Sequence, residues 1–246
     1  DQIKKQEAED RKELKKLVNG ITTLKRKFKP IQYVPLEIDI VKIIHFSYNI
    51  KVKNTRSGGT NERKKEGIMY DNFQGKLSEL ILYHDLPNKD DFEEIDLELY
   101  ERGKWDHSDL LSKDGQIHIN VKSGLSFHQM LLLTAKDYNK SGGYRHHKNS
   151  GKIEKELYAF VRLNIDKEKI TKMFSKSEDD FTKWFLKEYR IIEYDQFFSD
   201  ICQIKNAIQN KHLIYKDQML NGRTKMDADN YYLLVYNMYQ TLTELI

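Results

Sequence analysis

The chain has 246 residues, with 42 Lys and Arg against 38 Asp and Glu, a formal net charge of +4. That length supports one or two domains with a buried core, and an aromatic content of 11% argues against disorder. No apolar run approaches about 18 residues and no apolar segment follows the charged start, so we expect no membrane helix and no signal peptide.

The first predicted elements are helical. Apolar side chains at spacings of three and four predict a helix over residues 1–28, and Pro30 begins an extended connection. Residues 36–49 are apolar and β-branched, which fits a helix or a strand, and we favour the helix. A further helix is expected over residues 69–86, because its apolar residues share one face and Pro87 ends it.

A series of strands follows. Residues 94–101 alternate between apolar and polar side chains, which predicts a strand. Residues 108–112 and 116–122 flank the dipeptide Asp114-Gly115, a strong signal for a tight turn. The sequence therefore predicts a β-hairpin at this point.

The second half of the chain alternates between helices and strands. We expect a helix over residues 125–139, a strand over 156–165, a helix over 178–188, a short strand over 190–195, and helices over 196–210 and 226–245. This order predicts an α/β fold, with a central mixed β-sheet flanked by helices and additional helices at both ends. We expect an N-terminal helical and basic region over 1–68, a core over 69–195, and C-terminal helices over 196–246 packed on that core.

Positive charge is concentrated in two glycine-containing stretches. Residues 51–70 and residues 136–155 each hold six Lys and Arg against two acidic residues. Such loops suit a polyanion, because Lys and Arg neutralise phosphates, although a solvated loop is an equal alternative on composition alone. The candidate contacts to a nucleic acid are Arg56, Arg63, Lys64, Lys65, Arg145 and Lys148.

Four polar residues around the predicted hairpin carry the chemistry. Asp109 opens one strand and Lys122 closes the next, so the pairing of the strands brings them side by side. Asn120 lies two residues before Lys122 and therefore shares its face. Glu79, on the preceding helix, can pack against the same edge. Asp106 is an alternative metal ligand. We prefer Asp109, because apolar residues directly follow Asp109.

These residues suit metal-dependent hydrolysis of a phosphodiester. Mg²⁺ takes a few hard oxygen ligands, which Asp109, Glu79 and the amide of Asn120 can supply. Lys122 adds a cation that can orient the attacking water or stabilise the charge that develops on the phosphorus oxygens. We therefore expect Mg²⁺ as cofactor.

The pattern resembles a known family. A Glu on a helix, an Asp that opens a strand and a Lys that closes its partner resemble the PD-(D/E)XK nuclease superfamily. Within it, GKLSEL, SDLL and DGQIHINVKSG are most similar to type II restriction endonucleases, across about residues 70–165. The resemblance implies that Asp109 is the central metal ligand, Lys122 the catalytic lysine and Glu79 the helical acidic residue. Asn120 stands where the family usually has Asp or Glu.

The resemblance implies a function. It predicts a Mg²⁺-dependent, sequence-specific endonuclease of a restriction system that cleaves double-stranded DNA as a homodimer in the cytoplasm of a prokaryote. The single cysteine, Cys202, fits that reducing setting. Three alternatives remain open: a nucleic-acid-binding module that has lost catalysis, suggested by Asn120; a repair or resolvase-type nuclease of the same superfamily; and an interaction protein without DNA affinity.

Overall fold

A five-stranded mixed sheet forms the centre of the computed structural model, which describes residues 25–50, 64–98, 109–145, 155–220 and 224–245. The strands follow the order β1-β6-β5-β3-β2. They are β1 (Ile31–Tyr33), β2 (Leu110–Leu111), β3 (Ile117–Leu125), β5 (Lys155–Leu163) and β6 (Ile192–Asp200). β3 and β5 run parallel, whereas the other neighbours are antiparallel.

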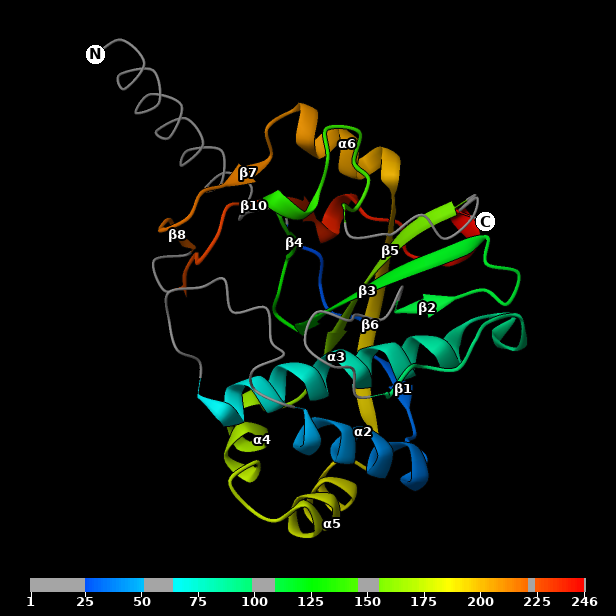
Figure 1. Cartoon of the computed structure of the whole chain (residues 1–246), viewed down its shortest axis with the longest axis vertical. Helices are drawn as coiled ribbons and strands as arrows, with labels where there is room; N and C mark the ends of the chain where they lie inside the picture. The colour runs from blue at the N-terminus through cyan, green and yellow to red at the C-terminus, as the bar shows by residue number, and fades with distance from the viewer. Residues whose placement is uncertain (1–24, 51–63, 99–108, 146–154, 221–223, 246) are drawn as a thin grey trace.

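Two smaller sheets and five described α-helices complete the fold (Figure 1). The second sheet has the order β4-β10-β7, and β8 pairs with β9 in a separate ribbon. These strands are β4 (Met130–Thr134), β7 (Leu213–Ile214), β8 (Met219–Leu220), β9 (Thr224–Lys225) and β10 (Asn230–Leu234). The helices are α2 (Glu37–Asn49), α3 (Lys65–Asp85), α4 (Lys167–Met173), α5 (Glu178–Glu188) and α6 (Ile201–Gln209), with 3₁₀ turns at Lys89–Asp91, Ala135–Asp137, Val235–Asn237 and Leu242–Glu244. Among these helices, none has the length and apolar character needed to cross a bilayer.

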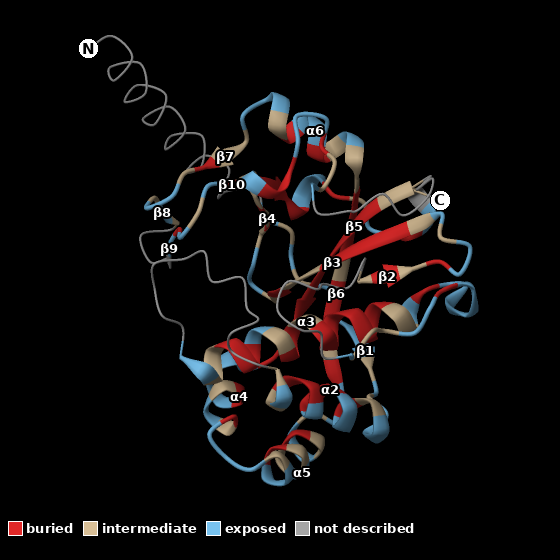
Figure 2. Cartoon of the chain, viewed as in Figure 1, coloured by how far each residue is buried: buried red, intermediate tan, exposed pale blue. Residues whose placement is uncertain are grey.

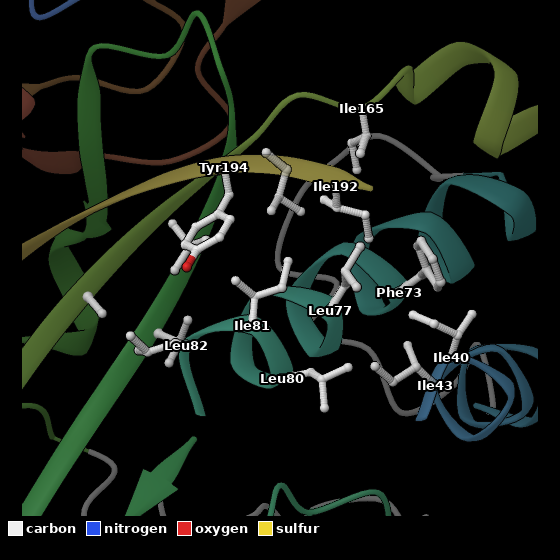
Figure 3. Close-up of a cluster of buried hydrophobic side chains, with 14 of the residues drawn as sticks. Ile40, Ile43, Phe73, Leu77, Leu80, Ile81, Leu82, Ile165, Ile192 and Tyr194 are labelled. Atoms are coloured by element: carbon white, nitrogen blue, oxygen red, sulfur yellow. The ribbon is translucent and has the colours of Figure 1, made fainter. Parts of the chain in front are cut away.

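Helix α3 covers one face of the main sheet, and α2 and α5 pack outside it (Figure 1). Leu77 and Ile81 of α3 point toward Ile192 of β6, while Ile40 of α2 closes the cluster from the other side (Figure 3). The burial of these apolar side chains, about 25 cal/mol per Å² removed from water, is the main stabilising term for this layer. Figure 2 shows the buried band that runs through α3, β3, β5 and β6.

The opposite face of the main sheet has its own apolar cluster. Tyr158, Phe160 and Phe197 project from it and pack with Leu131 of β4 and Ile204 of α6. Because side chains alternate along a strand, the two faces of β5 separate cleanly: residues with odd numbers join the α3 side and those with even numbers join this side.

A buried ion pair ties the elements of this second face together. Arg162 on β5 is 0% exposed, and its guanidinium donates to both carboxylate oxygens of Asp195 on β6. A third N–H of Arg162 reaches the carbonyl oxygen of His128 at 2.9 Å. The planar guanidinium thus links β5, β6 and the segment that leads into β4.

Several predicted elements are confirmed. The helices expected over 36–49 and 178–188 are α2 and α5, and the helix expected over 69–86 is α3, which begins earlier, at Lys65. The two hairpin strands are β2 and β3, and the strand expected over 156–165 is β5. The mixed α/β class with helices on the sheet is therefore confirmed at that level.

Other predicted elements are wrong. Residues 125–139 form the end of β3, β4 and a 3₁₀ turn instead of a helix, and residues 226–245 form β10 and two such turns. Residues 94–98 form no strand, and β6 extends to Asp200 before α6 begins. Of the additional C-terminal helices that the sequence predicts, the described residues contain one α-helix, α6.

The expected regions do not coincide with structural boundaries. The boundary after residue 68 falls inside α3, and the boundary after residue 195 falls inside β6. The helix predicted over 1–28 lies outside the described residues except for its last four, 25–28, which are not helical.

Candidate active site

The β2–β3 hairpin positions the predicted site. Leu110 pairs with Ile119 and Leu111 with His118 in an antiparallel ladder. Gly115 in the connecting turn has φ +73°, a left-handed conformation that glycine adopts without strain. Asp114 accepts hydrogen bonds from the Ser112 hydroxyl and from the Gln116 backbone N–H, and these bonds lower the pKa of its carboxyl group.

Asp109 is fixed at the point where the β2–β3 ladder ends. Its Oδ2 accepts a hydrogen bond from the backbone N–H of Val121 at 2.6 Å, so its carboxylate continues the ladder. No other described residue hydrogen-bonds to the carboxylate of Asp109. One oxygen therefore orients the group while the other remains available to a ligand.

Asn120 and Lys122 lie on the same face of β3, next to Asp109. Antiparallel pairing of Leu110 with Ile119 places Asp109 opposite Asn120. Asn120 is only 6% exposed, and its amide nitrogen has no hydrogen-bond partner in the described structure. Lys122 is half-buried and forms no ion pair within the ranges that the structure describes.

The three side chains therefore converge with unused hydrogen-bonding capacity. Leaving a buried polar group without a partner costs about 1–3 kcal/mol, and Asn120 is one of several such groups in the described structure, with Tyr33, Tyr70 and Ser78 among the others. An amide half-turn exchanges the nitrogen and oxygen of Asn120. Asp109 and Asn120 can thus present two hard oxygen donors, which suits Mg²⁺, beside the ammonium group of Lys122.

Strand β5 adds two polar residues that sequence reasoning missed. The parallel register places Glu156 beside His118 and Tyr158 beside Asn120. The Tyr158 hydroxyl donates to the Glu156 carboxylate. Burial raises the pKa of Tyr158 far above its usual range, and Tyr138 and Glu156 add to the shift, so its hydroxyl stays protonated. The sequence over 156–165 predicts the strand but does not identify the strand that pairs with it.

Glu79 has a different environment. Its Oε2 lies 2.7 Å from the ammonium nitrogen of Lys76, and both side chains are buried on α3. The Lys76 ammonium also lies 5.7 Å from the ring centre of Phe46 on α2. Because α3 packs on the face of β3 that carries Ile119, Glu79 belongs to the opposite side of the sheet from Asn120.

Half of the six predicted nucleic-acid contacts fall outside the described residues. These are Arg56, Arg63 and Lys148, as is the alternative acid Asp106. Lys64 and Lys65 are exposed at the start of α3. The Arg145 side chain donates from Nε to the carbonyl oxygen of Tyr138 at 2.8 Å.

The acidic residues do not form a closed metal cage. Within the described ranges, no group of three or more His, Cys, Asp or Glu side chains is placed to bind a metal ion. A site built on Asp109 and Asn120 would therefore leave most coordination positions to water and substrate oxygens, which is the usual mode for Mg²⁺.

Comparison of the chain with known proteins does not assign it to a family. No family model matches the chain, and no curated protein or solved structure is significantly similar to it.

Proposed function

We propose that the protein is a Mg²⁺-dependent endonuclease that hydrolyses phosphodiester bonds in double-stranded DNA, in the manner of type II restriction enzymes. The juxtaposition of Asp109, Asn120 and Lys122 on the hairpin supports the proposal, because each carries unused hydrogen-bonding capacity. These are the residue types that such hydrolysis needs in one place.

Each residue has a separate role in the proposed reaction. Asp109 and Asn120 would hold the metal ion, and the Val121 N–H fixes the orientation of the Asp109 carboxylate. The chemistry that Mg²⁺ would supply there, when bound, is polarisation of the phosphodiester and a lowered pKa of a coordinated water. Lys122 would donate to a non-bridging phosphate oxygen and stabilise the charge that develops there, or orient the attacking water. Tyr158, protonated and bonded to Glu156, borders Asn120 and keeps that side of the site polar.

The decisive experiment is cleavage of plasmid and phage DNA with and without Mg²⁺. Lys122→Ala is compared with Lys113→Ala, which removes an exposed lysine from the turn of the same hairpin. We expect Mg²⁺-dependent discrete fragments from the wild type and from Lys113→Ala, and none from Lys122→Ala. Cleavage that persists in Lys122→Ala would refute the proposed site. Cleavage confined to branched DNA would favour a repair nuclease instead.

A DNA-binding module without catalysis is the second candidate. Asn120 favours it, since an amide in place of a carboxylate removes one negative charge from the metal site. Such a module would shift DNA on a gel equally well in EDTA and in Mg²⁺ and would leave the DNA intact. A homodimer, which would suit a palindromic target, is part of the first proposal and can be tested by sedimentation with and without DNA.

A further inference from the structure

A polar cleft lies next to the proposed site, at the end of β3. Its volume is about 670 Å³, and it is lined by Lys64, Gly67, Asp71, Gln74, Ser123 and Lys167. Three separate elements meet there: the first turns of α3, the end of β3 and the start of α4. Ser123 directly follows Lys122, so the cleft adjoins the proposed catalytic lysine.

Among the described residues, no strand pairs with the edge of β3 between the site and the cleft. β2 pairs only with His118 and Ile119 of β3. The Asp109 carboxylate adds one further hydrogen bond, which it accepts from the backbone N–H of Val121. Beyond that point, no described strand pairs with β3 on this side. Lys122 and Ser123 point to opposite faces of this open edge. A chain of phosphates that crosses the edge would therefore pass from Lys122 into the cleft.

The cleft carries a net positive charge. Lys64 and Lys167 face a single acid, Asp71, which is itself engaged in an interaction. Lys167 has no ion pair with any described residue, whereas Lys169, one half-turn along α4, lies near Asp166 and Glu188.

Lys167 lies over an aromatic ring, and its positive charge acts on a neighbouring histidine. Its Nζ lies 5.0 Å from the ring centre of Tyr70, a cation–π distance. Desolvation lowers the pKa of His128, and the charges of Lys167 and Arg162 lower it further. A dianionic or monoanionic phosphate in the cleft would meet this field directly.

Gln74 provides a second, independent indication of a ligand. It is 8% exposed, lines the cleft, and forms no hydrogen bond or other polar interaction with the described part of the chain. The N-terminus of α3, which also opens here, has no side-chain cap. Its free N–H groups and partial positive charge favour an anion.

We propose that this cleft binds a backbone phosphate of the nucleic acid strand, with Lys64 and Lys167 as cationic contacts and Gln74 as a hydrogen-bond donor. The inference rests on the proposed function, because the phosphate belongs to the strand that is cut at Lys122. It adds Lys167, which lies on α4 outside both basic stretches of the sequence, to the substrate contacts.

The test is the salt dependence of DNA binding, measured in EDTA so that no cleavage occurs. Lys167→Ala is compared with Lys172→Ala, which removes the same charge from an exposed position of α4 that does not line the cleft. Losing one phosphate contact should reduce the slope of log affinity against log salt by about 0.9. At about 0.1 M salt this corresponds to about eight-fold weaker binding. Lys172→Ala should keep the wild-type slope, and Gln74→Glu should weaken binding as Lys167→Ala does.

The outcomes separate this inference from the proposed function. If log affinity falls against log salt with equal slopes for Lys167→Ala and Lys172→Ala, phosphate binding in the cleft is refuted, even if the wild type cleaves DNA. A selective loss in Lys167→Ala, without Mg²⁺-dependent cleavage by the wild type, would support the cleft and refute the nuclease. Absence of any salt-dependent DNA affinity would overturn both. Inorganic phosphate is the competitor: if millimolar phosphate displaces DNA from the wild type and from Lys167→Ala alike, the cleft is not the phosphate site.

Discussion

Asp109 combines a structural and a chemical role in one side chain. One carboxylate oxygen completes the β2–β3 ladder, and the other has no partner among the described residues. Asn120, opposite it, is buried, and its amide nitrogen has no hydrogen-bond partner in the part of the chain that the structure describes. At the scale of single residues, the candidate site is therefore defined by polar groups that the described part of the fold leaves unsatisfied.

Introducing a carboxylate at position 120 should strengthen metal binding at the proposed site. Asn120→Asp places a second negative charge beside Asp109, so half-maximal cleavage should need several-fold less Mg²⁺. Without metal, the same variant should unfold more readily, by on the order of 1–3 kcal/mol, because a buried carboxylate is desolvated next to a like charge. A Mg²⁺ titration of cleavage and thermal melts with and without Mg²⁺ measure both effects. Asn88→Asp, at an exposed position, is the control and should change neither quantity.

Glu79 should act on stability and not on metal binding. Glu79→Gln removes the carboxylate that lies 2.7 Å from the buried Lys76 ammonium, so the free energy of unfolding should fall by on the order of 3 kcal/mol. The double variant Lys76→Met/Glu79→Leu should recover much of this loss, since an apolar pair of similar volume needs no charge partner. The Mg²⁺ concentration for half-maximal cleavage should stay unchanged in both. An increase in Glu79→Gln alone would instead identify Glu79 as a ligand.

The hairpin is the element that determines the geometry of the site. Gly115→Ala forces a residue with a Cβ into φ +73° and should destabilise the protein by about 1 kcal/mol. Gly75→Ala is the matched control, for which we expect the opposite change in stability. A Cβ at Gly75, inside α3, meets no atom within 4 Å, so this variant should be stabilised by about 0.5–1 kcal/mol. Denaturant melts of both variants check the sign, and destabilisation by Gly75→Ala or stabilisation by Gly115→Ala would contradict it.

The sequence was informative where structure is local. Asp109, Asn120 and Lys122 were predicted because a turn signal and strand alternation within one hairpin determine their placement. Glu156 and Tyr158 were missed because only the parallel pairing of β3 with β5, across a long connection, brings them to the site. The sequence predicts a helix around Glu79 but does not indicate which face of the sheet this helix covers, so it does not show that Glu79 and Asn120 lie on opposite sides.

Two of the strands that the sequence did not predict, β4 and β10, share one cause. β4 and β10 pair with each other in antiparallel register, with Leu131 opposite Leu233. Both segments are short runs of consecutive apolar residues, which fit a helix and a strand equally well. The choice between them depends on a partner strand far away in the sequence, a contact that periodicity does not encode.

At the scale of the whole molecule, partly and fully buried tyrosines contribute to the response to alkali. Burial is the largest cause that raises the pKa of Tyr33 and Tyr48 from 10.0 to about 12, and it raises those of Tyr70 and Tyr194 further. The unfolded chain therefore loses these protons at lower pH than the folded chain. Between the two pKa values the unfolded state binds fewer protons, so rising pH favours unfolding.

The contribution of these tyrosines to the free energy of unfolding should thus be steady below pH 10.0 and fall as the pH rises toward 12. Tyr33→Phe is the informative variant, because the Tyr33 hydroxyl is buried without a hydrogen-bond partner in the described structure. It should keep wild-type stability below pH 10.0 and lose less stability above it. Urea melts across this range test the prediction, and an unchanged slope in Tyr33→Phe would contradict it.

The topology also sets an order for folding. The bonds of the β2–β3 hairpin, including that between Asp109 and Val121, join residues close in sequence, whereas β5 reaches β3 only after the connection that contains β4. Contacts between near neighbours form sooner than those that close long loops. The hairpin should therefore assemble with its polar residues in register while Asn120 is still in water, and the arrival of β5 then buries it. In pulsed hydrogen exchange during refolding, the N–H of Val121 should gain protection before the amides of β5.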